Sequence, residues 1–314
     1  MIMRSTDPDL LVRASRLYYL EDRGQAEIAR LLRISRPGVS RLLRRARDAK
    51  IVEIRVRETT GSEDRDALQR RLGVKELLVS PHGGIEAVGR LGAGVFERTV
   101  RRDDVIGLTA GTTLAAFVES VMPSRPVSID IVSLVGALRD TGEDFDCSFL
   151  CQELRRRTGG THRVLSAPAV VRDETLMRSL CREPRVRGVL ERYRALDSAY
   201  FGIGVASERH PVALAARAAA KRSARGADGL PRSAVASVGC LFFDATGRPC
   251  TSSLDRRTLG ISHEQLEAVP VRVGLAAGAE KRDAVLAVAR GGIVDILVID
   301  APLARSLLIT TREG

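Results

Sequence analysis

Apolar residues recur at intervals of three and four along the first 50 residues, which is the spacing of one buried face of a helix. Three such stripes predict three successive helices, and they consist of Leu10, Leu11, Ala14, Leu17 and Tyr18; of Ile28, Ala29 and Leu32; and of Val39, Leu42, Leu43 and Ala46. Residues 51–56, IVEIRV, alternate apolar and polar side chains and predict a short strand after the third helix.

The junction between the second and third predicted helices has the features of a helix-turn-helix. Ser35 is a good N-cap and Pro37 suits the first turn, so the third helix should begin there. Ala29 is small enough for the two helices to cross closely. Arg33 occupies the turn, where the backbone often needs a positive φ that would cost a non-glycine residue roughly 1 kcal/mol. We therefore predict a small α-helical head of the winged helix-turn-helix type.

A second pattern follows residues 57–66, RETTGSEDRD, a polar stretch that marks a boundary between a head of residues 1–57 and a body of residues 58–314. In the body, β-rich runs alternate with helical ones. The expected strands are 75–80, 103–111, 127–136, 162–170, 198–205, 234–244, 269–278 and 294–300, and the expected helices are 85–101, 113–121, 144–157, 211–224 and 281–291. This alternation predicts an α/β domain whose mostly parallel sheet is covered on both faces.

Charge separates the two regions further. The net charge of the chain is +11, and residues 1–57 hold 14 Lys and Arg against 7 Asp and Glu, whereas residues 58–314 hold 36 against 32. Most of the excess positive charge therefore lies in the first fifth of the chain. A small basic head on a near-neutral body is typical of a nucleic-acid-binding protein.

In a helix-turn-helix the third helix enters the major groove of DNA with its N-terminus first. The residues that would then face DNA are Gln25, Ser35, Arg36, Gly38, Ser40, Arg41, Arg44 and Arg45. Arg36 and Arg41 are candidates for guanine, because a guanidinium fork can donate two hydrogen bonds to its edge. Arg44 and Arg45 lie further along and suit phosphates. For each of these arginines, contact with a base and contact with a phosphate are equally open. The alternative to DNA binding as a whole is that this is a basic surface helix of a helical bundle.

Ligands of such α/β sheets bind at the carboxyl ends of the strands, so polar residues and glycines at strand ends are candidates. The strand ends supply Gly111, Thr112, Thr113, Gly136, Asp244, Gly278 and Lys281. Gly111, Thr112 and Thr113 lead from a strand into a helix, where backbone N–H groups and hydroxyls can hold a phosphate. A tight turn that binds nothing fits this stretch equally well, and Lys281 is also compatible with a surface lysine. Residues 202–204, GIG, lack the third glycine and the acid of a dinucleotide site.

These segments together resemble a known family. The stretch QAEIARLLRISRPGVSRLLRRARDAKIVEIRV resembles the DNA-binding head of the SorC/DeoR-type sugar-binding transcriptional regulators of bacteria. In the same order as in that family, GLTAGTTLAA, SLVGAL, APAV, FGIGV, VGCLFFDATGRP, TLGIS and VRVGLAAGAEKRDAVLAVARGGIVDILVIDAPLA resemble its effector-binding domain. The resemblance covers nearly the whole chain. It implies a Rossmann-like body related to sugar-phosphate isomerases and deaminases, and dimers or tetramers on palindromic operator DNA.

Carried over by position, the resemblance assigns roles to the strand-end residues. It implies that the stretch Gly111–Thr113 cradles the phosphate of a sugar effector, with Lys281 beside it, and that Asp244 meets the effector's hydroxyls. Asp300 begins DAPLA, where the family often has a pair of acids, and here the second position is Ala301. This departure leaves open which sugar, sugar phosphate or polyol is the effector.

Three functions are compatible with a basic head joined to an α/β body: a ligand-controlled regulator, an enzyme and an architectural DNA binder. We expect a homo-oligomeric regulator of carbohydrate metabolism with no cofactor and no metal. We expect it in the cytoplasm, because the odd number of cysteines, five, argues against a disulfide framework and no apolar run reaches 18 residues. A sugar-phosphate isomerase or deaminase is the alternative, but the four histidines show no pairing with nearby carboxylates, so we expect no enzyme. A purely architectural DNA binder would leave the large body without a role.

Overall fold

The computed structural model describes residues 8–19, 21, 23–49, 51–52, 62–124, 126–138, 146–220 and 229–309. The chain divides into two compact units, the head Met1–Arg57 and the body Glu58–Gly314. Within the described residues, no helix is long and apolar enough to cross a membrane. No group of three or more described His, Cys, Asp or Glu side chains is placed to hold a metal ion.

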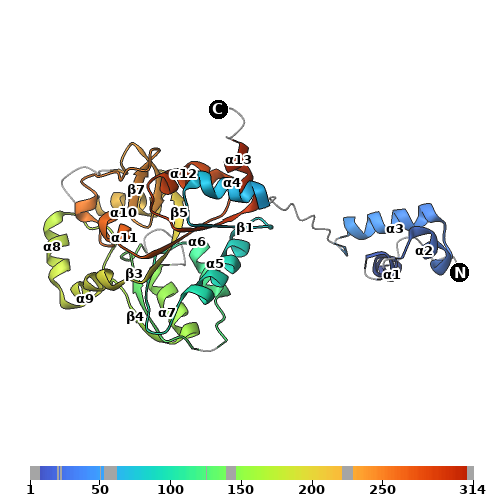
Figure 1. The fold of residues 1–314 in the computed structure, drawn as a ribbon, viewed down its shortest axis with the longest axis horizontal. Coiled ribbons are helices and arrows are strands. Elements are labelled where there is room, and N and C mark those ends of the chain that lie inside the picture. The colour runs from blue at the N-terminus through green and yellow to red at the C-terminus, as the bar shows by residue number, and fades with distance from the viewer. Residues whose placement is uncertain are drawn as a thin grey trace. The chain divides into compact units, whose positions relative to one another are not determined.

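The head contains the three helices that the apolar stripes predict, α1 (Pro8–Tyr19), α2 (Gln25–Leu32) and α3 (Arg36–Asp48) (Figure 1). All four apolar residues of the α3 stripe are buried, and they pack on Leu10, Leu11, Ala14 and Ile28 from α1 and α2. The strand expected over 51–56 lies mostly outside the described residues, which stop at Val52 and resume at Ser62.

The turn between α2 and α3 confirms the local predictions. Arg33 has φ 53° and ψ 43°, in the left-handed region, and it ends α2: its N–H donates to the Arg30 carbonyl at 3.3 Å, and the N–H of Ile34 donates to the Ala29 carbonyl at 3.0 Å. Ser35 caps α3 by accepting the N–H of Gly38 at 3.2 Å. The cap satisfies one of the backbone donors that a helix start leaves without a partner.

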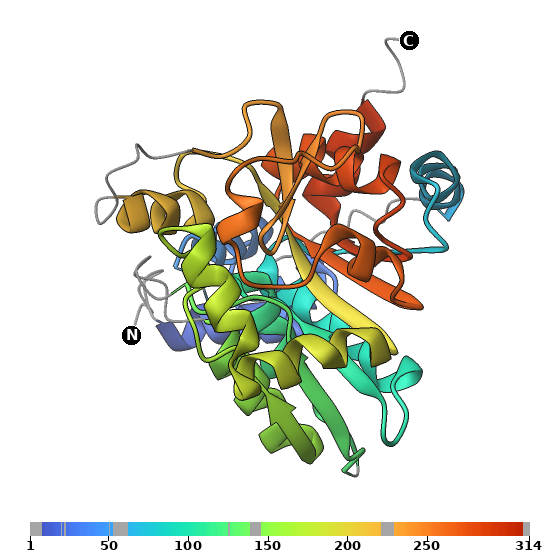
Figure 2. The same cartoon turned by 90° about the vertical axis from the view of Figure 1, so that its left-hand side faces the viewer.

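The body is built on a sheet whose seven central strands are all parallel, in the order β1-β9-β8-β5-β2-β3-β4. These strands are β1 (Glu76–Ser80), β2 (Val105–Leu108), β3 (Ile129–Ser133), β4 (Gly160–Arg163), β5 (Ser198–Val205), β8 (Val271–Ala276) and β9 (Ile296–Asp300). In Figure 2 the yellow strand β5 lies between the red C-terminal strands and the green earlier ones. The strand–helix alternation therefore predicted the parallel sheet correctly.

Helices cover both faces of this sheet, as Figure 1 shows for the body. One face carries α4 (Ser62–Leu72), α8 (Glu174–Arg182), α9 (Pro184–Arg192), α12 (Arg282–Arg290) and α13 (Ala301–Ile309), and the other carries α5 (Ile85–Thr99), α6 (Thr112–Ser120) and α7 (Cys147–Thr158). Alternate residues of one strand serve the two cores: Leu297 and Ile299 of β9 pack on the first side and Val298 on the second. A strand buried on both faces reads as a continuous apolar run, which is why β9 has no polar position before Asp300.

Two expected strands differ from the structure. Residues 234–244 form a hairpin of β6 (Ala234–Val238) and β7 (Leu241–Asp244), turned at Gly239 with φ 57°, and β6 pairs antiparallel with the end of β5. The run 162–170 is a strand only to Arg163, and beyond it Pro168 and Val170 form isolated bridges with Ala137 and Thr258. The remaining helices are α10 (Pro211–Ala220) and α11 (His263–Glu267).

Candidate functional site

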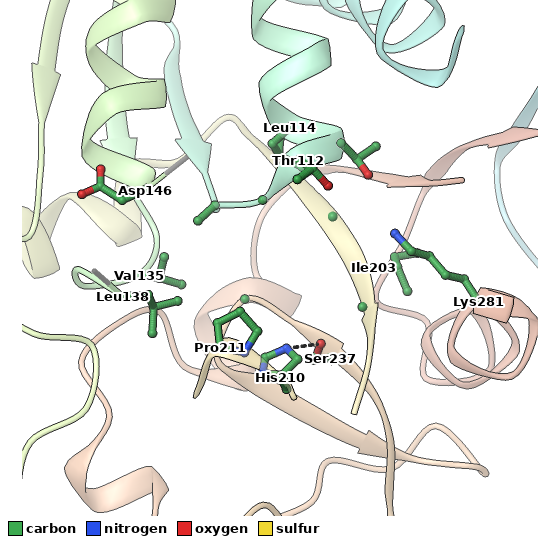
Figure 3. A pocket seen from close by; sticks show the side chains of 16 residues that line it. Thr112, Leu114, Val135, Leu138, Asp146, Ile203, His210, Pro211, Ser237 and Lys281 are labelled. Atoms are coloured by element: carbon green, nitrogen blue, oxygen red, sulfur yellow. Dashed lines mark hydrogen bonds between the residues drawn. The ribbon is translucent and has the colours of Figure 1, made fainter. Parts of the chain in front are cut away.

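A cavity of about 200 Å³ opens in the body at the carboxyl ends of β2 and β5. Its walls come from the loop after β2, the segment after β3, the end of β5, the start of α10, the β6–β7 hairpin and the turn before α12 (Figure 3). From β2 the chain continues through α6 to β3 on one side, whereas from its neighbour β5 it continues through α10 and the β6–β7 hairpin to β8 on the other side. A crevice at such a change of direction is where open α/β sheets bind ligands.

One end of the cavity is the N-terminus of α6. Gly111 precedes this helix with φ 127° and ψ 161°, and no side chain caps the helix start. A Cβ on Gly111 would meet no atom within 4 Å, so the backbone conformation rather than crowding favours glycine here. Thr112 is exposed and Thr113 is buried beside it. The uncapped N–H groups and the hydroxyls together make this end suited to an anion.

Lys281 stands at the same end of the cavity. It lies in the turn Ala279–Lys281 between β8 and α12, and Figure 3 shows its ammonium pointing toward the start of α6, where Thr112 stands. Burial lowers the pKa of Lys281, while the nearby carboxylates of Glu280 and Asp300 oppose that shift. No described residue accepts a hydrogen bond from the Lys281 ammonium. A partly desolvated cation without an ion pair attracts an anionic ligand group.

Asp300 and Gly278 do not line the cavity, although both were predicted to bind the effector. The Asp300 side chain is only 1% exposed and accepts backbone N–H groups from Gly84 at 2.9 Å, from Gly278 at 3.2 Å and from Leu303 at 3.1 Å. The carboxylate thereby ties together three segments next to the turn that carries Lys281. In the structure this carboxylate clamps the backbone behind the cavity, and its contact with an effector stays a prediction.

Gly136 and Asp244 lie outside the cavity as well. A Cβ on Gly136 would lie 2.8 Å from the Ala167 carbonyl oxygen, so this glycine allows a close backbone approach. Asp244 accepts hydrogen bonds from the Thr246 hydroxyl at 2.6 Å and from the Arg248 N–H at 3.0 Å. The Thr246 hydroxyl is the main cause that lowers the pKa of Asp244. Asp244 thus closes the turn that follows β7, with its carboxylate occupied by donors of that turn, and this turn lies outside the cavity.

The cavity also has residues that the sequence did not single out. Ser237 and His210 face each other at the side opposite Thr112 in Figure 3, with the Nε2 and Oγ atoms 2.8 Å apart. Burial lowers the pKa of His210 to about 4, so the ring is neutral at neutral pH. The remaining wall residues are largely apolar: the GIG stretch 202–204, which the sequence does not favour as a dinucleotide site, and Ala110, Leu114, Val135, Leu138, Asp146, Pro211 and Gly239. A search for carboxylate partners misses His210 because its partner is a hydroxyl 27 residues further along the chain.

The predicted DNA-facing residues of the head lie on α3 and in the turn before it, except Gln25, which begins α2. Ser35, Arg36, Ser40, Arg41, Arg44 and Arg45 are exposed, and Gly38 and Gln25 are half-buried. A Cβ on Gly38 would lie 3.3 Å from the Ser35 hydroxyl oxygen, so glycine leaves room for the cap. The N-terminal half of α3 therefore presents two arginines beside small residues, and its apolar stripe is withdrawn into the head.

Comparison with known proteins adds independent information. Residues 58–309 match the model of the family described as "Putative sugar-binding domain". The chain is 28% identical over 309 residues to the deoxyribonucleoside regulator of Bacillus subtilis, which covers 95% of this chain and 97% of that protein. It is 27% identical over 318 residues to the sorbitol operon regulator of Klebsiella pneumoniae, covering 97% and 99%.

A solved structure shows the same fold. The crystal structure of the full-length sorbitol operon regulator SorC from Klebsiella pneumoniae superposes with a TM-score of 0.71 at 24% identity, over 96% of this chain and 99% of that one. The relatives named here are regulators, and none of their names denotes an enzyme.

Proposed function

This chain belongs to the SorC/DeoR-type family of sugar-binding transcriptional regulators, and on that premise we propose that it is a DNA-binding regulator of carbohydrate metabolism controlled by an anionic sugar effector. The single observation that supports this most is the cavity in the body, where the uncapped start of α6 and Lys281 converge at one end. The same chain carries a basic head whose exposed helix is suited to DNA.

The head supplies the DNA-binding half of the proposal. Residues 1–57 carry twice as many Lys and Arg as Asp and Glu, 14 against 7. The α2–turn–α3 arrangement places Arg36 and Arg41 at the exposed start of a capped helix, the part that enters the major groove in helix-turn-helix proteins. Arg44 and Arg45 are further along the same helix, where phosphate contacts would orient it.

The body supplies the effector half. We assign Gly111, Thr112, Thr113 and Lys281 to the anionic group of the effector, because N–H groups at a helix start, hydroxyls and an ammonium all stabilise phosphate oxygens. The cavity of about 200 Å³ suits a molecule of monosaccharide size. Binding there changes the affinity of the head for DNA only if the two sites are energetically coupled, and then DNA changes effector affinity by the same factor.

The assembly completes the proposal. We propose that the regulator acts in the cytoplasm as a homodimer or homotetramer, whose two-fold symmetry matches a palindromic operator. A sugar-phosphate isomerase or deaminase is not favoured, since the relatives are transcriptional regulators.

The test starts from DNA that the full chain selects from a random library. Complex formation on this DNA is measured by gel shift with inorganic phosphate and with a panel of free sugars, polyols and sugar phosphates. We expect at least one phosphorylated sugar to change the affinity for DNA, and Lys281→Met to abolish this response. Arg290→Met removes the same charge from an exposed position outside the cavity and serves as the control. A response that survives Lys281→Met undiminished contradicts the assigned anion site.

A further inference from the structure

The end of β5 carries a bare position at which a side chain would not fit. Gly204 on β5 lies directly opposite Ser237 on β6 in the antiparallel pairing of the two strands. A Cβ on Gly204 would lie 2.6 Å from the Ser237 hydroxyl oxygen and 3.7 Å from Nε2 of His210. The GIG stretch therefore makes room for a serine–histidine pair rather than for a dinucleotide.

The His210 ring is held in one orientation and one tautomer. Nδ1 accepts the backbone N–H of Val212 at 3.2 Å, and the ring meets Phe242 edge-on at a centroid distance of 5.3 Å. Because Nδ1 is an acceptor, the proton of the neutral ring is on Nε2. Nε2–H then donates to the Ser237 hydroxyl oxygen at 2.8 Å.

This polarity separates the pair from a nucleophile and its base. A base must take the serine proton on Nε2, usually while a carboxylate accepts from Nδ1–H. In this protein Nε2 already carries the ring proton, and Nδ1 accepts a hydrogen bond from the Val212 N–H. Ser237 therefore keeps its own proton, and with one lone pair occupied by His210 that proton is available to a molecule in the cavity.

We propose that Ser237, positioned by His210, selects an effector that presents an oxygen acceptor, a carbonyl or hydroxyl oxygen, at the end opposite its anionic group. The inference rests on the proposed function, which assigns the anionic group to the α6 and Lys281 end. In Figure 3 the two ends lie on opposite sides of the cavity. Pro211, which stands beside the pair in Figure 3, offers no side-chain hydrogen bond to that oxygen.

The substrate class follows from these two ends. An effector with a phosphate at one end and an oxygen at the other satisfies both, whereas an alkyl phosphate of equal length would satisfy only the first. Placing such an alkyl end here would leave the Ser237 hydroxyl proton without an acceptor in a largely apolar wall. A lost hydrogen bond of this kind weakens binding by about tenfold.

The experiment measures dissociation constants by calorimetry with the full chain. The probes are inorganic phosphate, n-pentyl and n-hexyl phosphate, and a panel of pentose, hexose and polyol phosphates of the same two lengths. We expect the tightest sugar phosphate to bind wild type at least tenfold more tightly than its alkyl counterpart. Ser237→Ala should remove most of that difference and leave the alkyl phosphates unchanged. Ser179→Ala, an exposed serine on α8, is the matched control.

The role of His210 is tested through Ser237. His210→Gln can place an N–H near the Ser237 oxygen and should restore part of the preference that His210→Leu loses. In a Ser237→Ala background the two His210 variants should no longer differ, which a merely structural effect of the ring would not produce. Circular dichroism verifies that each variant is folded.

The outcomes separate the two proposals. If alkyl and sugar phosphates bind equally well, or Ser237→Ala keeps the sugar preference, the inference is overturned while the anion site stands. If Lys281→Met weakens none of the probes, the anion site of the proposed function fails instead.

Discussion

Acidification should destabilise the body through His210, in a pH range where most other groups do not titrate. Burial lowers the pKa of His210 from 6.5 to about 4 in the folded protein. Between these two values the unfolded chain binds a proton that the folded chain does not. The stabilising contribution of the neutral ring is therefore complete above pH 6.5 and is lost as the pH falls toward 4.

The size of the effect follows from the two pKa values. Each unit of pKa difference corresponds to about 1.4 kcal/mol. A difference of roughly 2.5 units thus removes about 3 kcal/mol of unfolding free energy by pH 4, a large part of the 5–15 kcal/mol typical of a domain. His263, whose pKa burial also lowers, acts in the same direction. Its contribution cancels when wild type and His210→Gln are compared.

The assay is urea unfolding of wild type and His210→Gln at half-unit steps from pH 7.5 to pH 4. The chain has no tryptophan, so the buried Tyr193 and Tyr200 report on the body through tyrosine fluorescence. We expect the wild-type unfolding free energy to fall more steeply, by up to about 1.4 kcal/mol for each pH unit below 6.5. Any constant offset from the substitution does not matter. Two parallel curves over this range would refute the assignment of a neutral, buried His210.

Three further predictions concern the head and the clamp behind the cavity. Arg36→Ala should lose sequence preference on selected DNA, whereas Arg45→Ala should weaken selected and random DNA alike and reduce the salt dependence by about one counterion; equal losses on both DNAs for the two variants in a gel-shift series would contradict the division of roles. Arg33→Gly should raise the unfolding free energy of the head by about 1 kcal/mol in thermal denaturation, because Arg33 has a positive φ of 53°; a lower melting temperature would argue against this turn. Asp300→Asn should destabilise the body by about 2–4 kcal/mol, since an amide nitrogen would face backbone N–H groups that now donate to the carboxylate; the turn carboxylate variant Asp244→Asn should cost clearly less, and equal losses in urea unfolding would reject the clamp.

The head could be predicted from the sequence because its signals are local. The N-cap, the proline after it and the apolar stripe of α3 all lie within 12 residues, and each has a direct structural consequence. Even Arg33, an unusual turn residue, takes the positive φ that its position requires. Three short helices joined by tight turns can pack in few ways, so these local signals largely determine the structure of the head.

The cavity end that holds Gly111, Thr112, Thr113 and Lys281, the proposed anion site, was predictable for a similar reason. Gly111, Thr112 and Thr113 are consecutive and mark the passage from β2 into α6, and in a parallel sheet every such passage lies on the ligand-binding edge. Lys281 follows β8 in the same way. The rule applies to any strand of the parallel sheet, and it needs no knowledge of which strands are neighbours.

The same rule does not bring Asp244 or Asp300 to the cavity wall, and the reasons differ. Asp244 ends a strand, but that strand belongs to a hairpin, and an apolar run does not show whether its partner is parallel or antiparallel. Asp300 does end a parallel strand, yet three backbone N–H groups lie within 3.2 Å of its carboxylate. A carboxylate with that many internal donors has little capacity left for a ligand.

The pair Ser237 and His210 at the other end of the cavity depends on the same β6–β7 hairpin that carries Asp244. Folding back at Gly239 brings β6 against the end of β5, so Ser237 comes to face Gly204 and lies within reach of His210. Neither the serine nor the histidine carries a local motif, and the glycine between them is meaningful only once the register is known. The antiparallel hairpin thus adds to the parallel sheet a feature that its strand ends alone do not provide, a hydroxyl across the cavity from the proposed anion site.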